Sequence, residues 1–102
     1  MRHAAYVYMM SNNAHRIYVG ATTDLVQRVR QHRNRTYPNA YTARYTFDRL
    51  VYWEALPTFA DAERREKQIK GWSRAKRVAL IEAMNPWWND LSADYVDLLS
   101  AQ

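Results

Sequence analysis

The sequence predicts an α+β fold, an α/β layered arrangement in which one small antiparallel sheet of three strands is flanked by about three helices. Short runs of aromatic and β-branched residues occur near the start of the chain and around residue 50, and apolar residues recur at helical spacing elsewhere. Three short strands are too few for a two-sheet sandwich, so helices must cover the one sheet. A chain of 102 residues, 48% of them hydrophobic, is expected to form one domain.

The strands are indicated by composition and by the turns between them. The first two are rich in tyrosine and β-branched residues, and an Asn-containing turn between them predicts a β-hairpin. Pro57 ends the third strand. The expected order is ββαβαα, with strands at residues 5–10, 16–20 and 49–55 and helices at residues 24–33, 58–71 and 73–84.

Capping residues bound the helices. Asp24 offers a cap to the first helix, in which Leu25 and Val29 share one face. Thr58 opens the second helix with a variant of the capping box, and Gly71 is expected to end it. Ser73 caps the third helix, which an Asn-Pro pair ends. Residues 34–44 follow no period and are expected to be a loop.

Charge is unevenly distributed along the chain. Residues 1–49 hold eight arginines against two aspartates, a net charge of +6, whereas residues 50–102 are close to neutral. Clustered arginine in a chain with a pI near 9.7 indicates a polyanionic partner such as nucleic acid. The absence of cysteine excludes disulfides and zinc-thiolate sites and favours a cytoplasmic location. The apolar runs are too short to span a bilayer, so no membrane association is expected.

Most of the common catalytic motifs are missing. The two glycines stand alone, so there is no glycine-rich phosphate loop, and the three histidines lack the spacing of zinc ligands. No serine lies in a nucleophile elbow. These absences exclude the usual nucleotide hydrolases, zinc enzymes and acyl-transfer enzymes.

One set of residues remains that could carry chemistry. Tyr8 and Tyr18 lie on the two paired strands, where Gly20 permits close approach of a ligand or a neighbouring backbone. Arg28 and His32 are four residues apart and therefore share one face of the first helix. Taken singly, each residue has an ordinary structural explanation, because tyrosine favours strands and helical arginines are usually solvated. Only their joint spacing singles them out.

That joint spacing resembles the GIY-YIG nucleases, including the catalytic domains of GIY-YIG endonucleases and of the excision-repair nuclease subunit. The resemblance covers roughly residues 4–92, and its later part is similar to a small stand-alone subgroup. It implies a GIY-YIG-like nuclease domain at residues 1–92, followed by an acidic C-terminal tail at residues 93–102. The matching segments are residues 6–8, 18–20, 23–32, 65–72 and 85–91.

The resemblance implies an endonuclease that hydrolyses phosphodiester bonds in DNA with Mg²⁺ or Mn²⁺ as its cofactor. Tyr8 would activate or position the attacking water, and Tyr18 would help to hold the water and the phosphate. Arg28 would neutralise the scissile phosphate, and Glu66 would bind the metal. Asn85 competes with Asn89 as the site asparagine. The implied catalytic residues are Tyr8, Tyr18, Arg28, His32, Glu66 and Asn89. The basic residues expected to contact nucleic acid are Arg30, Arg33, Arg35, Arg44, Lys67 and Lys70.

Several alternatives stay open. The ordinary pKa of tyrosine is about 10, so Tyr8 either acts as a base with help from nearby positive charge or only orients the water. The chain could instead be a non-catalytic nucleic-acid-binding module that retains the fold, or a protein-interaction domain that uses exposed aromatic residues. A domain of this size has little surface for reading a long DNA sequence. Structured or damaged DNA in repair or recombination is therefore expected as substrate, or a protein partner that supplies targeting.

Overall fold

The computed structural model describes residues 5–34 and 47–92 of the chain. Within them the elements follow the predicted order of two strands, a helix, a strand and two helices. Their bounds are β1 Ala5–Ser11, β2 Ile17–Thr22, α1 Leu25–Asn34, β3 Arg49–Leu56, α3 Phe59–Lys70 and α4 Arg74–Met84. The prediction of an α+β fold with one three-stranded antiparallel sheet is confirmed.

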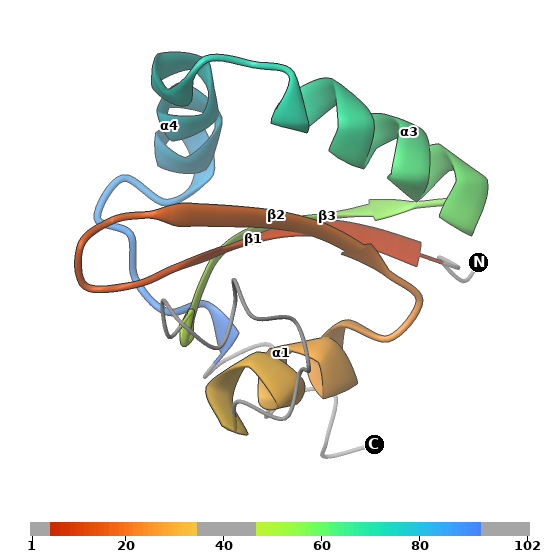
Figure 1. Ribbon diagram of the computed structural model, residues 1–102, viewed down its shortest axis with the longest axis horizontal. Coiled ribbons are helices and arrows are strands. Elements are labelled where there is room, and N and C mark those ends of the chain that lie inside the picture. Colours follow the sequence, from red (N-terminus) through yellow and green to blue (C-terminus); the bar gives the residue numbers. More distant parts are fainter. Residues whose placement is uncertain (1–4, 35–46, 93–102) are drawn as a thin grey trace.

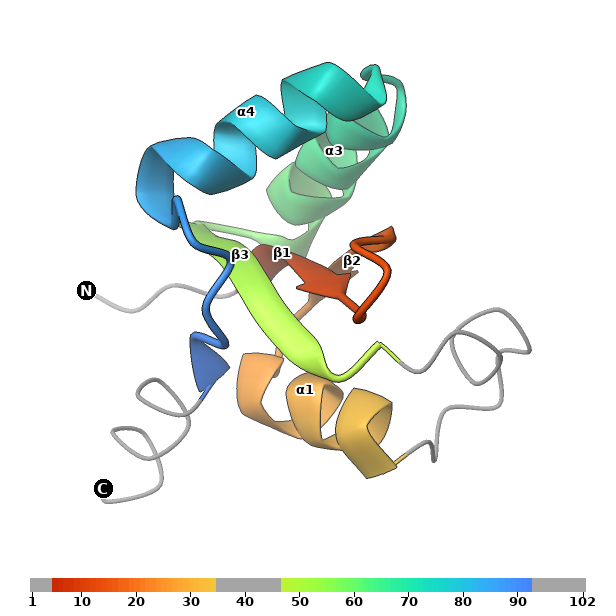
Figure 2. The ribbon, with the colours of Figure 1, turned by 90° about the vertical axis from the view of Figure 1, so that its left-hand side faces the viewer.

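The sheet lies between two layers of helix, as Figures 1 and 2 show. Its strand order is β2-β1-β3, so β1 is central and pairs antiparallel with both neighbours. Helices α3 and α4 cover one face of the sheet, and α1 covers the other (Figure 2). Because successive side chains of a strand point to opposite faces, β1 contributes alternate residues to two separate clusters.

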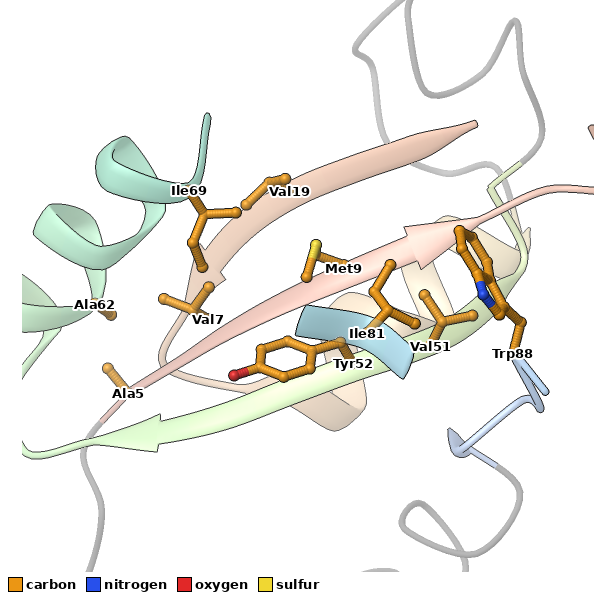
Figure 3. Close-up of a cluster of buried hydrophobic side chains, with 10 residues drawn as sticks. All are labelled: Ala5, Val7, Met9, Val19, Val51, Tyr52, Ala62, Ile69, Ile81 and Trp88. Atoms are coloured by element: carbon orange, nitrogen blue, oxygen red, sulfur yellow. The ribbon is translucent and has the colours of Figure 1, made fainter. Parts of the chain in front are cut away.

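The cluster between the sheet and α3/α4 is an apolar core. Val7 and Met9 of β1 enter it, whereas Tyr8 and Met10 enter the cluster on the α1 side. Ile69 faces the core from α3 and Ile81 from α4. Figure 3 shows the ten buried residues of this core, which are Ala5, Val7, Met9, Val19, Val51, Tyr52, Ala62, Ile69, Ile81 and Trp88.

A β-bulge in β3 adjusts which side chains reach each face. Met9 pairs with Tyr52 but Met10 pairs with Leu50, so Val51 is an extra residue on β3. Val51 and Tyr52 both lie in the α3/α4 core as a result, although they are adjacent in sequence. Leu50 lies in the cluster on the α1 side.

The free edge of β3 is covered by residues 85–92. This segment runs from the end of α4 past β3 to the α1 side of the sheet (Figure 2). The side-chain amide of Asn85 donates to the carbonyl of Val51 at 3.1 Å, and the backbone N–H of Leu91 donates to the carbonyl of Leu50 at 2.8 Å. These bonds satisfy backbone groups that an exposed edge strand would leave open.

The predicted helix caps are confirmed. The backbone N–H groups of Gln27, Asp61 and Lys76 donate to the side chains of Asp24, Thr58 and Ser73 respectively. The second helix ends at Gly71 as predicted, but this glycine has a φ of −80° and needs no left-handed conformation.

Two predictions lie outside the described residues. Most of the loop predicted at residues 34–44 and the whole acidic tail at residues 93–102 fall there. No helix in the part of the chain that the structure describes is long and apolar enough to cross a membrane.

Candidate active site

Three of the predicted site residues meet on the α1 side of the sheet. The hydroxyl of Tyr8 lies 3.1 Å from Nε2 of His32, within hydrogen-bond distance. The ring of Tyr18 lies 5.0 Å from the ring of His32 and 6.3 Å from that of Tyr8, centroid to centroid. Two adjacent strands and α1 therefore bring together residues that are up to 24 positions apart in sequence.

The helical period of α1 explains how His32 reaches this position. Leu25 and Val29 are buried in the cluster on the α1 side, and His32 follows them one turn later on the same stripe. Its side chain is 3% exposed, and its ring packs edge-on against both tyrosines. The predicted face of Leu25 and Val29 is confirmed, and His32 extends it by one turn.

Gly20 is required by the tyrosine opposite it. Tyr8 pairs directly with Gly20 across the β1–β2 ladder, and a Cβ at position 20 would lie 2.5 Å from the Tyr8 hydroxyl oxygen. The glycine thus accepts the end of a fully buried tyrosine side chain. The sequence predicted close approach by a ligand or a backbone, and the described structure shows that a side chain occupies this space.

Burial sets the protonation state of His32. Removal of the imidazole from water, together with the positive charge of Arg28, lowers the pKa of His32 to about 4. The ring is therefore neutral at pH 7. In the tautomer that carries its proton on Nδ1, Nε2 accepts the hydrogen bond from the Tyr8 hydroxyl; in the other tautomer Nε2 donates to that oxygen.

Arg28 lies one helical turn before His32 and is half-buried. Its effect on the pKa of His32 shows that its charge acts on this cluster. An arginine beside a neutral imidazole and two phenols provides positive charge and hydrogen-bond donors to an anion such as a phosphate.

Phe47 completes the cluster, and sequence reasoning missed it. Its ring is fully buried and lies 5.8 Å from that of Tyr18. It precedes β3 in a segment with no clear period, so no pattern in the sequence marked it. Together with Leu50 it gives the Tyr8–Tyr18–His32 cluster an apolar surround, which explains why His32 is desolvated.

Glu66 lies in the other layer of the molecule. It is on α3, the helix that covers the opposite face of the sheet. Its carboxylate pairs with the ammonium group of Lys70 at 2.6 Å, and 22% of its side-chain surface is exposed. Among the described residues no three His, Asp or Glu side chains gather into a cluster that could hold a metal ion.

The two candidate asparagines have different environments. Asn85 is 4% exposed, and its side chain bonds to the backbone of Val51 and to both the carbonyl and the N–H of Asn89. Asn85 therefore holds the turn after α4 together. Asn89 contributes only backbone atoms to these bonds, and the residue is exposed. The place of Asn89 in the site stays a prediction.

The predicted nucleic-acid contacts divide into several kinds. Arg33 donates to Ser92 and forms a 3.1 Å ion pair with Asp90, so its charge is partly offset within the chain. Lys70 is paired with Glu66. Arg30 and Lys67 are exposed. Arg35 and Arg44 lie outside the described residues.

Comparison with known proteins agrees with this fold and shows the family of the chain. The GIY-YIG catalytic domain matches residues 4–79, a span that contains Tyr8, Tyr18, Arg28, His32 and Glu66. The chain therefore belongs to the GIY-YIG family, which is of nuclease type.

Its relatives are small proteins of similar length. A UPF0213 protein of Haloquadratum walsbyi is 38% identical over 77 residues, which cover 76% of this chain and 85% of the relative. A UPF0213 protein of Syntrophus aciditrophicus is 32% identical over 81 residues, or 79% and 92% of the two chains. The solution NMR structure of a UPF0213 protein from Bacillus halodurans matches with a TM-score of 0.54 at 30% identity, covering 86% of this chain and 94% of that one.

Proposed function

We propose that this protein is a divalent-metal-dependent endonuclease that hydrolyses phosphodiester bonds in DNA. The observation that carries the proposal is the hydrogen bond between Tyr8 and neutral His32, beside Tyr18 and the charge of Arg28. A buried phenol joined to a neutral imidazole is a proton-handling pair. Membership of a nuclease-type family supplies the substrate class.

The chain's own residues divide the work of hydrolysis. In the tautomer that accepts from Tyr8, His32 takes up the phenol proton as the Tyr8 oxygen takes a proton from the attacking water. Arg28 binds the scissile phosphate and offsets the negative charge that grows on its oxygens. Tyr18 packs edge-on against His32 and keeps the imidazole oriented toward Tyr8.

Glu66 would hold the metal, and its chemistry fits Mg²⁺ or Mn²⁺. Mg²⁺ keeps most of its water shell and commonly binds through one or two carboxylates together with substrate phosphate oxygens, so one glutamate suffices. The chemistry that a divalent cation supplies is positive charge at the phosphoryl oxygens. Lys70 now pairs with this carboxylate and would have to release it.

The test is a cleavage assay with single-stranded, nicked, branched and duplex DNA in Mg²⁺ or Mn²⁺. Glu66→Gln is compared with Glu63→Gln, which removes the same charge from an exposed position on the same helix. We expect the wild type and Glu63→Gln to cut at least one substrate and Glu66→Gln to lose most of that activity. Equal cutting by both variants, or no cutting of any substrate, would contradict the proposal.

A second function is favoured by the burial of Tyr8. The side chain has no exposed surface, and Glu66 lies in the other helix layer. A nucleic-acid-binding module without catalysis would require neither group to reach a substrate. It predicts salt-dependent DNA binding that survives Glu66→Gln and Tyr8→Phe and needs no metal, in a protein that leaves all four substrates intact.

The small size of the domain limits how it can select a DNA substrate. A domain with a radius of gyration of 12.9 Å offers little surface for reading a long base sequence. We therefore propose that the substrate is recognised by its structure or damage, as in repair or recombination, or that a protein partner delivers the domain. The cytoplasm is the proposed location.

A further inference from the structure

The junction of α3 and α4 is strongly basic. Residues 67–81 contain five basic residues and no acidic one. We name the group around this junction the basic corner, and its members are Lys67, Lys70, Arg74, Lys76 and Arg77. The junction lies on the side of the sheet away from α1 (Figures 1 and 2). It is therefore separate from the Tyr8–Tyr18–His32 cluster.

Most of these charges form no ion pair with the described residues. The ion pairs among the described residues on α3 use Arg64 with Asp61, Arg65 with Glu54 and Lys70 with Glu66. None of the ion pairs in residues 5–34 and 47–92 involves Lys67, Arg74, Lys76 or Arg77. Lys67, Arg74 and Lys76 are exposed. Their combined field is available to an external anion.

Trp72 holds part of the basic corner in place. The ammonium of Lys76 lies 4.5 Å from the centroid of the Trp72 ring, and the guanidinium carbon of Arg65 lies 5.2 Å from it. Arg77 donates to the carbonyl oxygen of Trp72 at 3.1 Å. The ring itself packs on the apolar core. Lys76 and Arg77 are thus held on a rigid support, which reduces the entropy lost when they bind a ligand.

The arginines of α1 contrast with this arrangement. Arg33 is paired with Asp90, and Arg28 belongs to the proposed catalytic cluster. A set of cations of which most form no ion pair among the described residues matches the regular negative charge of a nucleic-acid backbone.

We infer that the basic corner binds the phosphate backbone of duplex DNA, on the face of the sheet opposite the Tyr8–Tyr18–His32 cluster. The inference rests on DNA being the substrate of the proposed function, but it does not depend on catalysis. It gives the small domain affinity for a duplex without sequence readout, since lysine and arginine contacts to phosphate carry no base information.

The test is the salt dependence of DNA binding by the full chain without metal. Anisotropy of a fluorescein-labelled DNA duplex in EDTA gives the association constant over a series of salt concentrations. Lys67→Gln/Arg74→Gln is compared with Arg16→Gln/Arg49→Gln, which removes the same charge from the β1–β2 turn and the start of β3. Far-UV circular dichroism confirms that both variants fold.

Each lost phosphate contact lowers the slope of log K against log salt by about 0.9. We expect the basic-corner variant to bind with a slope shallower by about 1.8, and the control to keep the wild-type slope. The inference would be overturned if the wild type and both variants had equal slopes, or if the control changed as much as the basic-corner variant. It would also be overturned if the slope changed only when a duplex RNA replaced the DNA. Because no metal is present, failure here leaves the cleavage assay with Glu66→Gln to decide the proposed function separately.

Discussion

The two faces of the sheet each bury a hydrogen-bonded tyrosine, and the partners of these tyrosines differ. On the α3/α4 face the hydroxyl of Tyr52 donates to the carboxylate of Glu54 at 3.0 Å. On the α1 face the hydroxyl of Tyr8 lies 3.1 Å from the imidazole of His32. Burial and the nearby charge of Glu54 raise the pKa of Tyr52 to about 12, so this phenol keeps its proton.

The partner therefore decides what a buried tyrosine can do. Tyr52 donates to Glu54, and Arg65 also donates to Glu54 at 2.7 Å, so the protonated phenol lies beside the Arg65–Glu54 ion pair. This arrangement joins β3 to α3 and has no proton to exchange near pH 7. The partner of Tyr8 is an imidazole that burial keeps neutral at pH 7, so in one tautomer its Nε2 can accept the phenol proton. We accordingly propose a structural role for Tyr52 and a role in proton transfer for Tyr8.

The largest expected effect on stability comes from protonating His32. Its folded pKa of about 4 lies below the ordinary value of 6.5, so between these values the unfolded chain binds more protons than the folded one. Stability is then fully present above pH 6.5 and falls as the pH drops toward 4. The full shift corresponds to about 3 kcal/mol.

Chemical denaturation of the wild type and of His32→Gln between pH 5 and 7.5 measures this effect. We expect the wild type to lose stability on acidification through this range, and His32→Gln to lose much less. His15→Gln, at an exposed histidine, is the control and should retain the wild-type slope. Parallel curves for the wild type and His32→Gln would show that His32 is not buried as a neutral ring.

A smaller effect is expected from the contact between Gly20 and Tyr8. Gly20→Ala places a methyl group 2.5 Å from the Tyr8 oxygen and should destabilise the fold by about 2 kcal/mol, because the buried ring has no room to move. Gly71→Ala meets its nearest atom at 3.5 Å and should be neutral or stabilising. Thermal unfolding compares the two, and equal losses would contradict the packing described for Tyr8.

The smallest expected effect separates the two asparagines. Asn85→Ala removes the side-chain bonds that join the turn after α4 to β3, and should cost about 1–2 kcal/mol. Asn89→Ala should leave stability unchanged within about 0.5 kcal/mol. Urea titration gives both values. If Asn89→Ala were destabilised instead, the side chain of Asn89 would have a structural role, contrary to the bonds described for Asn85.

Local patterns predicted most of the fold. The strands, helices and caps were predictable because period-two and period-3.6 patterns and capping residues act over a few positions, as with Leu25, Val29 and His32 in α1. The bulge at Val51 and the burial of Phe47 were not, because both depend on pairing between distant segments. Neither leaves a pattern in its own neighbourhood.

The site was predicted in part for the same reason. The spacing of Tyr8, Tyr18 and Arg28 indicated a cluster, and the structure places Tyr8, Tyr18 and His32 in contact. The ion-pair partners of the charged residues could not be predicted from the sequence. Glu66 and Lys70 are four apart on a helix that also holds other acids and bases, and Arg33 pairs with Asp90, 57 residues away. The roles of Glu66 and Asn89 stay predictions.

The central claim is that Tyr8, on the α1 face of the sheet, takes part in the proposed cleavage, and one matched pair of variants tests it directly. Tyr8→Phe and Tyr52→Phe each remove one hydrogen-bonded hydroxyl from a buried tyrosine, on opposite faces of the sheet. The measurement is the first-order rate of DNA cleavage by each variant in Mg²⁺. We predict a loss of at least about a hundredfold for Tyr8→Phe and a rate close to that of the wild type for Tyr52→Phe. Equal rates for the two variants would contradict the claim.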